Sequence, residues 1–397
     1  MSSHVMNGTG TAPAGTFRAE NTNASTRWAD CVGTFPSPPK NGVALVGVLP
    51  GEGIGPEIVD CALAVARAAV DRHGVRLQLE FGSDIGKRAE VQHGTALPAD
   101  VIGFCSGIFS RGGAVLSGAG GGRYVYDLRS RFDLFCKLSP VVVPGELAGA
   151  GRMRPGHAAG VDVLVVREGT SGLYQGQWET TSQPEVGRVA RHTFSYCEAH
   201  VRRVVTAAAR IAARRQRRLA VIYKESGAPS ISELWRECAL EIAAENGVTS
   251  SFLDIDYSAY RLVQHPNEFD VIVAPNLFGD IVSDLGGLLM GSRALTYGGN
   301  FSADGAAFYQ TNHGAAYDLA DLDRANPVGQ ILSAAMMLRE SYGLGEASYA
   351  IEEAIRSVWR QGWRTADLEE EGCRVAGTRQ FTDLILEVLA GGKPSAA

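Results

Sequence analysis

The sequence lacks the features of several common protein classes. No apolar run approaches the ~20 residues that a membrane span requires, and the first residues contain no hydrophobic segment of the kind that directs secretion. The 7 cysteines are dispersed without a C-x-x-C pair, which indicates reduced thiols rather than a disulfide framework or a zinc site. The net charge of −6 argues against a nucleic-acid partner. We therefore expect a cytoplasmic protein that binds neither membranes nor nucleic acids.

The length and the order of segments predict the α/β class. A chain of 397 residues exceeds what one core usually organises, so we expect two domains or one large α/β unit with lobes. Apolar runs of strand length, such as 43–49 and 219–223, alternate with helical patterns such as 230–246. Residues 1–40 are rich in Ser, Thr, Asn, Gly, Ala and Pro. This composition predicts a flexible extension, with a partner-binding tail as the alternative.

A glycine-rich turn follows the first predicted strand. It reads Pro-Gly-Glu-Gly-Ile-Gly-Pro-Glu over 50–57 and leads into a helical pattern that ends near Val70. Unpaired backbone N–H groups at such a helix start form a cradle for an anion. The dinucleotide fingerprint G-x-G-x-x-G is absent because Pro56 occupies the position of its third glycine. The turn is therefore a candidate ligand loop, but other α/β domains open in a similar way.

Two carboxylates follow a second buried strand. The apolar run 269–274 breaks at Pro275-Asn276, and Asp280 and Asp284 come directly after it. If a helix begins near Phe278, their spacing of four places both on one face. Their repulsion is relieved by a cation, and oxygen ligands suit Mg²⁺ or Mn²⁺. The alternative, which spacing alone favours, is one carboxylate at a helix N-terminus and one solvated carboxylate.

Basic side chains gather after a glycine-heavy stretch. Residues 112–122 are rich in glycine, and Arg123, Arg129 and Arg131 follow. Guanidinium groups match carboxylates and phosphates, so this segment is a candidate anion clamp. The alternative is a disordered surface loop with solvated charges. The cluster Arg214-Arg-Gln-Arg-Arg218 instead follows an alanine-rich helical pattern, and we interpret it as the end of a helix rather than a phosphate site.

Chemically active side chains also follow other predicted strands. Arg167 and Tyr174 come after the run 161–166, Lys224 comes after 219–223, and Asp256 ends 251–256. Ligands of α/β proteins bind at the carboxyl ends of strands. One such residue is commonly structural, but several together indicate a site. His313 is either an ordinary loop histidine or part of a ligand loop.

With these motifs in place, the chain resembles the β-decarboxylating dehydrogenase family, which includes 3-isopropylmalate, isocitrate, homoisocitrate and tartrate or malate dehydrogenases. The resemblance covers roughly 43–389 and rests on motifs in family order at family spacing. These motifs are 49–57 (Leu-Pro-Gly-Glu-Gly-Ile-Gly-Pro-Glu), 165–174 (Val-Val-Arg-Glu-Gly-Thr-Ser-Gly-Leu-Tyr), 276–285 (Asn-Leu-Phe-Gly-Asp-Ile-Val-Ser-Asp-Leu) and 331–338 (Ile-Leu-Ser-Ala-Ala-Met-Met-Leu). Because of this resemblance, we expect Asp280 and Asp284 to form a metal site rather than to act as a helix-terminal and a solvated carboxylate.

The resemblance implies an isopropylmalate dehydrogenase-like fold with two α/β domains, a central mixed sheet and a cleft between the domains, unlike a Rossmann fold. One domain would contain 41–134 and 292–397, on the cofactor side, and 135–291 would form a central domain. It also implies a homodimer with shared active sites, in which Lys224 and Asp256 reach across to the neighbouring subunit.

The resemblance further implies oxidative decarboxylation of a malate-type 2-hydroxy acid. Asp256, Asp280 and Asp284 would hold Mg²⁺ or Mn²⁺, which lowers the pKa of the substrate hydroxyl. Lys224, coupled to Asp256, would take that proton, and Tyr174 would protonate the carbon that loses CO₂. Arg129 and Arg167 would bind the substrate carboxylate.

For the cofactor, the resemblance implies a nicotinamide dinucleotide. Its contacts would include Ile54, the loop His313-Gly314-Ala315-Ala316 and Asn326. Asp318 occupies the place of an acid that meets the ribose 2′-hydroxyl, and this acid would repel a 2′-phosphate. NAD is therefore expected rather than NADP.

The chain departs from the family pattern at a second group of positions. Ser139 stands where the third clamp arginine is expected, and Arg131 or Lys137 is a candidate replacement. Arg123 lies in the specificity segment, where an arginine favours a polar or anionic substituent over an isopropyl group. Further departures are Glu52 for aspartate, Ser226 for asparagine and Tyr317 for proline. The alternatives are a 3-isopropylmalate dehydrogenase proper, a catalytically silent regulatory subunit of a heteromeric dehydrogenase, and an enzyme that performs only the oxidation or only the decarboxylation.

Overall fold

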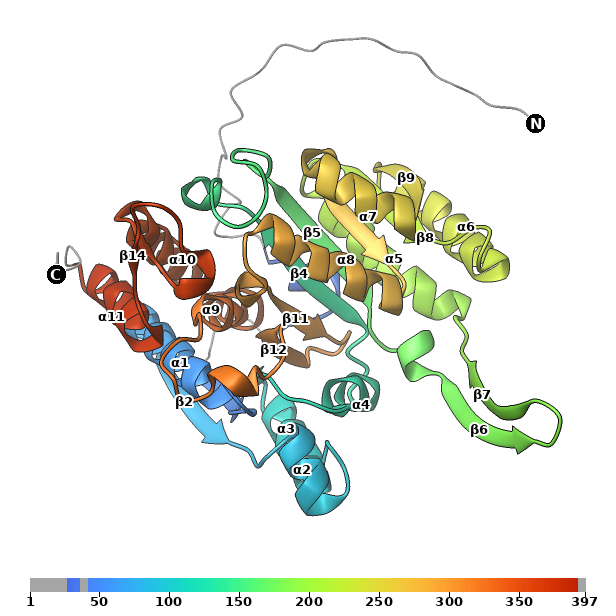
Figure 1. Cartoon of the computed structure of the whole chain (residues 1–397), viewed down its shortest axis with the longest axis horizontal. Helices are drawn as coiled ribbons and strands as arrows, with labels where there is room; N and C mark the ends of the chain where they lie inside the picture. Colours follow the sequence, from blue (N-terminus) through green and yellow to red (C-terminus); the bar gives the residue numbers. More distant parts are fainter. Residues whose placement is uncertain (1–26, 36–41, 392–397) are drawn as a thin grey trace, which may run out of the picture.

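The computed structural model describes residues 27–35 and 42–391. A ten-stranded sheet forms the centre of this part of the chain (Figure 1). In spatial order its strands are β2 (Arg76–Phe81), β1 (Val43–Leu49), β3 (Ala114–Ser117), β12 (Ala307–Thr311), β11 (Tyr297–Phe301), β4 (Cys136–Val142), β5 (Asp162–Glu168), β10 (Val271–Ala274), β8 (Arg218–Tyr223) and β9 (Thr249–Asp254). The central mixed sheet expected from the sequence is therefore confirmed.

The sheet changes direction at its centre. β4 runs antiparallel to both of its neighbours, β11 and β5, and β11 also runs antiparallel to β12. The flanking pairs, such as β1 with β3 and β10 with β8, are parallel. Every strand from β2 to β11 belongs to 41–134 or 292–397, and every strand from β4 to β9 belongs to 135–291. One sheet thus runs continuously through both predicted domains, whose boundary remains a prediction.

Helices connect and cover the strands, as the α/β class requires. They are α1 (Gly55–Asp71), α2 (Gly86–His93), α3 (Ala99–Ser110), α4 (Tyr124–Arg131), α5 (Glu198–Ala213), α6 (Pro229–Glu245), α7 (Ile255–Gln264), α8 (Asn276–Leu289), α9 (Val328–Tyr342), α10 (Gly345–Arg360) and α11 (Thr378–Leu389). α5 ends at Ala213, directly before Arg214. The interpretation of the basic cluster as the end of a helix is confirmed. None of the helices in the described ranges is both long and apolar enough to cross a membrane.

Two shorter sheets stand apart from the central one. β13 (Trp363–Arg364) pairs with β14 (Arg374–Val375). β6 (Gln177–Gln183) pairs with β7 (Gly187–Thr193) as an antiparallel hairpin that projects from the body (Figure 1). Nearly every residue of this hairpin arm is exposed, including Trp178. A two-stranded hairpin without a buried face is marginal by itself, so contacts at its base or with another molecule have to stabilise it.

One expectation about irregular segments is wrong in part, and one alternative is wrong. Residues 27–35 belong to the predicted flexible extension, yet Trp28 and Phe35 are buried and Ala29 N–H donates to the Glu340 carboxylate over 2.9 Å. The aromatic residues anchor this segment, while the rest of 1–40 lies outside the described residues. The glycine-heavy stretch is also ordered, because it contains the buried strand β3 and leads into α4.

Candidate functional site

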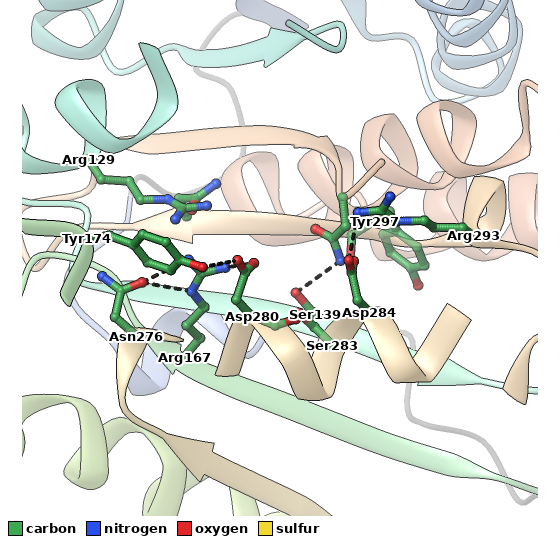
Figure 2. Close-up of polar contacts among 12 residues, drawn as sticks. Arg129, Ser139, Arg167, Tyr174, Asn276, Asp280, Ser283, Asp284, Arg293 and Tyr297 are labelled. Carbon is green, nitrogen blue, oxygen red and sulfur yellow. Dashed lines mark hydrogen bonds and ion pairs between the residues drawn. The ribbon is translucent and has the colours of Figure 1, made fainter. Parts of the chain in front are cut away.

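The two aspartates lie one turn apart on α8, which packs against β5. The helix begins at Asn276, directly after Pro275, rather than near Phe278. Asp280 points toward the strand ends, where it forms an ion pair with Arg167 and accepts a hydrogen bond of 2.9 Å from the Tyr174 hydroxyl (Figure 2). The strand-end residue and the helix residue therefore meet as the sequence suggested.

Asn276 fixes the orientation of Arg167. Its Oδ1 accepts hydrogen bonds from Arg167 Nε at 2.9 Å and Nη2 at 2.8 Å, and its Nδ2 donates to the Ser171 carbonyl over 3.0 Å. Gly279 allows α8 to approach, since a Cβ at this position would lie 2.8 Å from the Arg167 side chain. Arg167 is only 2% exposed, so its guanidinium is held in one place before any ligand arrives.

Arg129 is a second buried guanidinium near Asp280. It extends from α4, and its Nε donates to Asn300 Oδ1 on β11 over 2.8 Å. Its Nη1 is buried and has no hydrogen-bond partner among the described residues. Burial and the neighbouring charge of Arg167 lower the pKa of Arg129. A buried cation with an unused donor is suited to an incoming anion.

Lys137 is a third buried cation in the same place. It lies on β4, in register with Arg167 on β5 and Asn300 on β11. Burial lowers its pKa well below the ordinary lysine value, and the charges of Arg129 and Arg167 add to the effect, against Asp280 and Asp284. The buried group of three cations faces one neighbouring carboxylate that is engaged with it, Asp280. An anionic ligand would correct this imbalance.

Ser139 lies two residues beyond Lys137 on β4, so the two side chains project from the same face of the strand. Ser139 is buried, and its hydroxyl accepts a long hydrogen bond of 3.4 Å from Asn312 Nδ2. No arginine occupies this place. Lys137 is buried beside this position, whereas Arg131 is exposed at the end of α4. That one of them replaces the missing arginine remains a prediction.

The described part of the chain contains no group of three or more side chains of His, Cys, Asp or Glu that could hold a metal ion. Asp284 pairs with Arg293 over 2.6 Å, one turn along α8 from Asp280. Asp256 lies in the first turn of α7, is 72% exposed and accepts a hydrogen bond of 2.7 Å from Lys224. Asp280 and Asp284 together offer hard oxygen ligands that fit Mg²⁺ or Mn²⁺ in part. Within one chain, Asp256, the predicted third ligand, does not lie with Asp280 and Asp284.

The protonation states of the site follow from these contacts. Burial opposes ionisation of Asp280, but Arg167 and Lys137 outweigh it and lower the pKa of Asp280. Burial and the Asp280 charge raise the pKa of Tyr174, which stays protonated and can donate. Hydrogen bonds to Asp256 and Asp254 raise the pKa of Lys224.

The predicted cofactor residues lie around the glycine-rich turn. Ile54 N–H donates to the Ala315 carbonyl over 2.9 Å, and a side chain at Gly53 would collide with the same carbonyl. His313 bonds to the Gly314 carbonyl, and its buried Nε2 has no partner in the described chain. The turn and the loop from His313 to Ala316 are thus held in contact with each other.

The other two cofactor candidates, Asp318 and Asn326, differ in how accessible they are to a ligand. Asp318 is exposed on the loop after Ala316. Asn326 is buried, where it accepts a hydrogen bond from Val328 N–H and donates to Asp367 over 3.1 Å. Asn326 therefore also has a structural task at the start of α9.

Two departures from the family pattern contact each other. The Glu52 carboxylate accepts hydrogen bonds from the Tyr317 hydroxyl at 2.8 Å, from Gly121 N–H at 2.9 Å and from Arg88 N–H. Burial opposes these bonds, but together they lower the pKa of Glu52. A carboxylate one methylene longer and a tyrosine thus tie the glycine-rich turn to the loop of Asp318. Sequence reasoning noted both residues but not their contact.

Sequence reasoning named Arg123 as a substrate-binding candidate, but it foresaw neither Tyr126 nor the contact of Arg123 with the Tyr174 segment. Arg123 Nη2 donates to the Tyr174 carbonyl over 2.9 Å, and the Tyr126 ring lies 4.8 Å from the Tyr174 ring. Whether Arg123 also selects the substrate remains a prediction. The only available signal for Tyr126 was its spacing of three from Arg123 and from Arg129 on one helix face.

The comparisons with known proteins agree with this architecture. Residues 45–385 match the family model described as isocitrate/isopropylmalate dehydrogenase. The 3-isopropylmalate dehydrogenase of Geobacillus kaustophilus is 36% identical over 86% of this chain and 94% of its own length, and that of Thermosynechococcus vestitus is 38% identical over 87% and 98%. The crystal structure of isocitrate dehydrogenase from Methylococcus capsulatus superposes with a TM-score of 0.77 at 31% identity, covering 87% of this chain and 99% of that one. The chain therefore belongs to the isocitrate/isopropylmalate dehydrogenase family.

Proposed function

We propose that the protein catalyses metal-dependent oxidative decarboxylation of a malate-type 2-hydroxy acid with a polar or anionic substituent, and that NAD accepts the hydride. One observation carries the proposal. The buried side chains Arg129, Lys137 and Arg167 gather near the Asp280 carboxylate, which also accepts a hydrogen bond from the Tyr174 hydroxyl. Cations for a carboxylate, oxygens for a metal and a proton donor are thus combined at one place.

The buried cations bind the substrate carboxylates. Arg167 is preset by Asn276, and Arg129 has an unused Nη1 donor. Lys137 supplies the third charge in place of an arginine at 139, because an incoming carboxylate favours its protonated form and offsets the effects that lower its pKa. Because these cations are already desolvated, each charge-assisted hydrogen bond to a carboxylate contributes about 1.5 to 3 kcal/mol.

Asp280 and Asp284 would hold Mg²⁺ or Mn²⁺ together with Asp256 of the partner subunit. Such an ion supplies the positive charge that makes the substrate hydroxyl acidic and the negative charge left by CO₂ tolerable. Arg167 and Tyr174 keep Asp280 oriented toward this position. Half-buried Lys224 and exposed Asp256 form a pair that a second copy of the chain could contact.

Proton movements are assigned to the other side chains. Hydrogen bonds to Asp256 and Asp254 raise the pKa of Lys224, so Lys224 first has to release its own proton to solvent. The neutral amine, coupled to Asp256, then takes the hydroxyl proton of the substrate while hydride leaves the same carbon for the nicotinamide. The resulting β-keto acid loses CO₂. Tyr174 then gives its proton to the carbon that carried the carboxylate, consistent with its raised pKa. Each 2-hydroxy acid thus yields one CO₂, one reduced cofactor and one 2-keto acid.

A homodimer with shared sites is part of the proposal. Large apolar side chains are exposed on neighbouring helices, Tyr257 and Tyr260 on α7 and Ile281 and Leu288 on α8. Contiguous exposed apolar surface is typical of an interface. The α7 helix also carries Asp256. Burial of this surface by a second copy would bring Asp256 to the neighbour's α8.

NAD is preferred because of the loop that contains Asp318. This exposed acid lies next to the loop that the glycine-rich turn holds in place. A 2′-phosphate near its carboxylate would be repelled, whereas a 2′-hydroxyl could donate a hydrogen bond.

The test is an assay of purified protein with Mn²⁺ and either NAD or NADP. The substrates are isocitrate, 3-isopropylmalate, D-malate and tartrate, with CO₂ measured beside the reduced cofactor. We expect NAD reduction with stoichiometric CO₂ for a polar or anionic substrate. Efficient turnover of 3-isopropylmalate would reject the substituent inference, and reduction without CO₂ would reject decarboxylation.

A further inference from the structure

Tyr174 is held from several directions by side chains of different elements. It lies in the short helix η4 (Leu173–Gln175) that follows β5. Its hydroxyl donates to Asp280, and its ring lies beside the guanidinium of Arg167, at 5.5 Å, and beside the ring of Tyr126, at 4.8 Å. The Arg167 and Asp280 contacts come from β5 and α8, whereas the Tyr126 contact comes from α4.

The backbone of this segment is also held by α4. Arg123 Nη2 donates to the Tyr174 carbonyl over 2.9 Å, and Gln175 Nε2 donates to the Tyr126 carbonyl over 2.8 Å. The Arg123 guanidinium lies 4.7 Å from the Trp178 ring, at the base of the hairpin arm. Asp127, one turn along α4, lies 3.7 Å from Arg123 and helps to orient it. One arginine therefore joins α4, the Tyr174 segment and the arm.

These contacts connect the two halves of the sheet. α4 follows β3, in the half that contains β1 and β12, whereas η4 and the arm follow β5 in the other half. A shift of one half relative to the other would move Arg123 and Tyr126 away from Tyr174. Because misplacement of a reacting group by about 1 Å can cost up to ~100-fold in rate, this contact controls the efficiency of any proton transfer by Tyr174.

We infer that Arg123 and Tyr126 form a clamp between the two halves of the protein that positions Tyr174 as proton donor, and that Arg123 links this position to the hairpin arm through Trp178. The inference rests on the proposed function of Tyr174. Arg123 is in this account a positioning residue, because its guanidinium is engaged by the Tyr174 carbonyl and the Trp178 ring. Its effect falls on the proton-transfer step rather than on substrate affinity, and a polar or anionic substituent would be bound by the buried cations instead.

The test compares Arg123→Gln and Tyr126→Leu with a matched control, Arg191→Gln. Arg191 is an exposed arginine on the same arm, and it pairs with Glu179 inside the hairpin. For both clamp variants we expect kcat to fall on the order of tenfold with KM nearly unchanged. NAD reduction and CO₂ release should fall together in steady state, whereas the NADH formed in a single turnover should keep its normal amplitude, because hydride transfer and CO₂ loss precede the step of Tyr174. Arg123→Lys should recover part of kcat, since an ammonium can reach the Tyr174 carbonyl.

A second measurement does not depend on activity. Hydrogen–deuterium exchange of the intact protein should show faster exchange over 172–178 in Arg123→Gln, and no change in Arg191→Gln. The amides of Gln175 and Gly176, which bond to the Gly172 and Leu173 carbonyls, report on this segment. Unchanged exchange together with unchanged kcat would overturn the clamp. A rise in KM at constant kcat would overturn it too, because that result assigns Arg123 to substrate binding.

Tyr174→Phe separates the clamp from the proposed function. If this variant turns over at the normal steady-state rate, Tyr174 is not the proton donor and the proposed function fails at that step. If it is inactive while Arg123→Gln is normal in both measurements, only the clamp fails.

Discussion

Lys137→Met should make the protein more stable and a poorer catalyst. Lys137 is only 3% exposed, and the structure shows no hydrogen bond from it to another described residue. It lies between the charges of Arg129 and Arg167, which disfavour its protonated form. Methionine fills a similar volume without a charge. By analogy with buried ion groups replaced by apolar residues, we expect the free energy of unfolding to rise by about 1 to 4 kcal/mol.

The catalytic loss is estimated from the contact that Lys137 offers to the substrate. One charge-assisted hydrogen bond contributes about 1.5 to 3 kcal/mol, and about 1.4 kcal/mol corresponds to a tenfold change. kcat/KM should therefore fall by roughly 10- to 150-fold. Lys137→Arg, which retains the charge, should lose less. Urea denaturation and steady-state kinetics measure the two effects.

The pH dependence of stability is an independent test of whether the Lys137 charge destabilises the fold. Because the pKa of Lys137 is lowered in the folded protein, the unfolded chain binds more protons at any pH between the folded and the ordinary lysine values. The free energy of unfolding of the unmodified protein should therefore rise with pH in this interval, relative to Lys137→Met. A Met variant that is less stable by more than about 1 kcal/mol, or one with unchanged kcat/KM, would refute the assignment of Lys137 as an unpaired cation for substrate.

Three further outcomes follow from contacts of individual side chains. Tyr317→Phe removes the hydrogen bond to Glu52 and should raise the KM for NAD several-fold and lower the free energy of unfolding by about 1 kcal/mol, whereas Tyr349→Phe, at an exposed site on α10, should change neither. Buried Asp270 accepts a hydrogen bond of 2.7 Å from Arg215 Nε, and Arg215 Nη2 also pairs with Asp162 over 2.9 Å. Asp270→Asn removes the inner of these two carboxylates and should destabilise the fold by about 1 to 3 kcal/mol in urea denaturation, because Asp162 still neutralises Arg215; no measurable loss would contradict this account of the ion pair. Removal of divalent metal with EDTA should abolish NAD reduction and Mn²⁺ should restore it, while Asp284→Asn should weaken Mn²⁺ binding in calorimetry; full activity in EDTA would exclude the metal.

The strand ends and helix α8 could be predicted from local sequence patterns. Asp280, Arg167 and Tyr174 follow buried apolar runs with clear boundaries, and the structure brings them together. Their convergence could be expected because parallel strands end at the same edge of a sheet.

The centre of the site could not be predicted in this way. Lys137 and Asn300 meet because β4 runs antiparallel between β11 and β5. β4 contains a charged residue and Pro140, which has no N–H for the sheet, so its sequence does not look like a central strand. The contact of Glu52 with Tyr317 and that of Arg123 with Tyr174 are long-range as well. These contacts depend on how the two halves of the protein pack against each other, and they produce no periodic pattern in the sequence.

The most direct test of the shared, metal-dependent site is complementation between inactive variants. Lys224→Met and Asp280→Asn homodimers should each be inactive, since each lacks one component of every site. After dissociation and random reassembly of an equal mixture, half of the dimers are mixed, and each mixed dimer has one intact site. The account predicts recovery of about a quarter of the unmodified activity, dependent on Mn²⁺ or Mg²⁺. No recovery, in a mixture shown to contain mixed dimers, would contradict it.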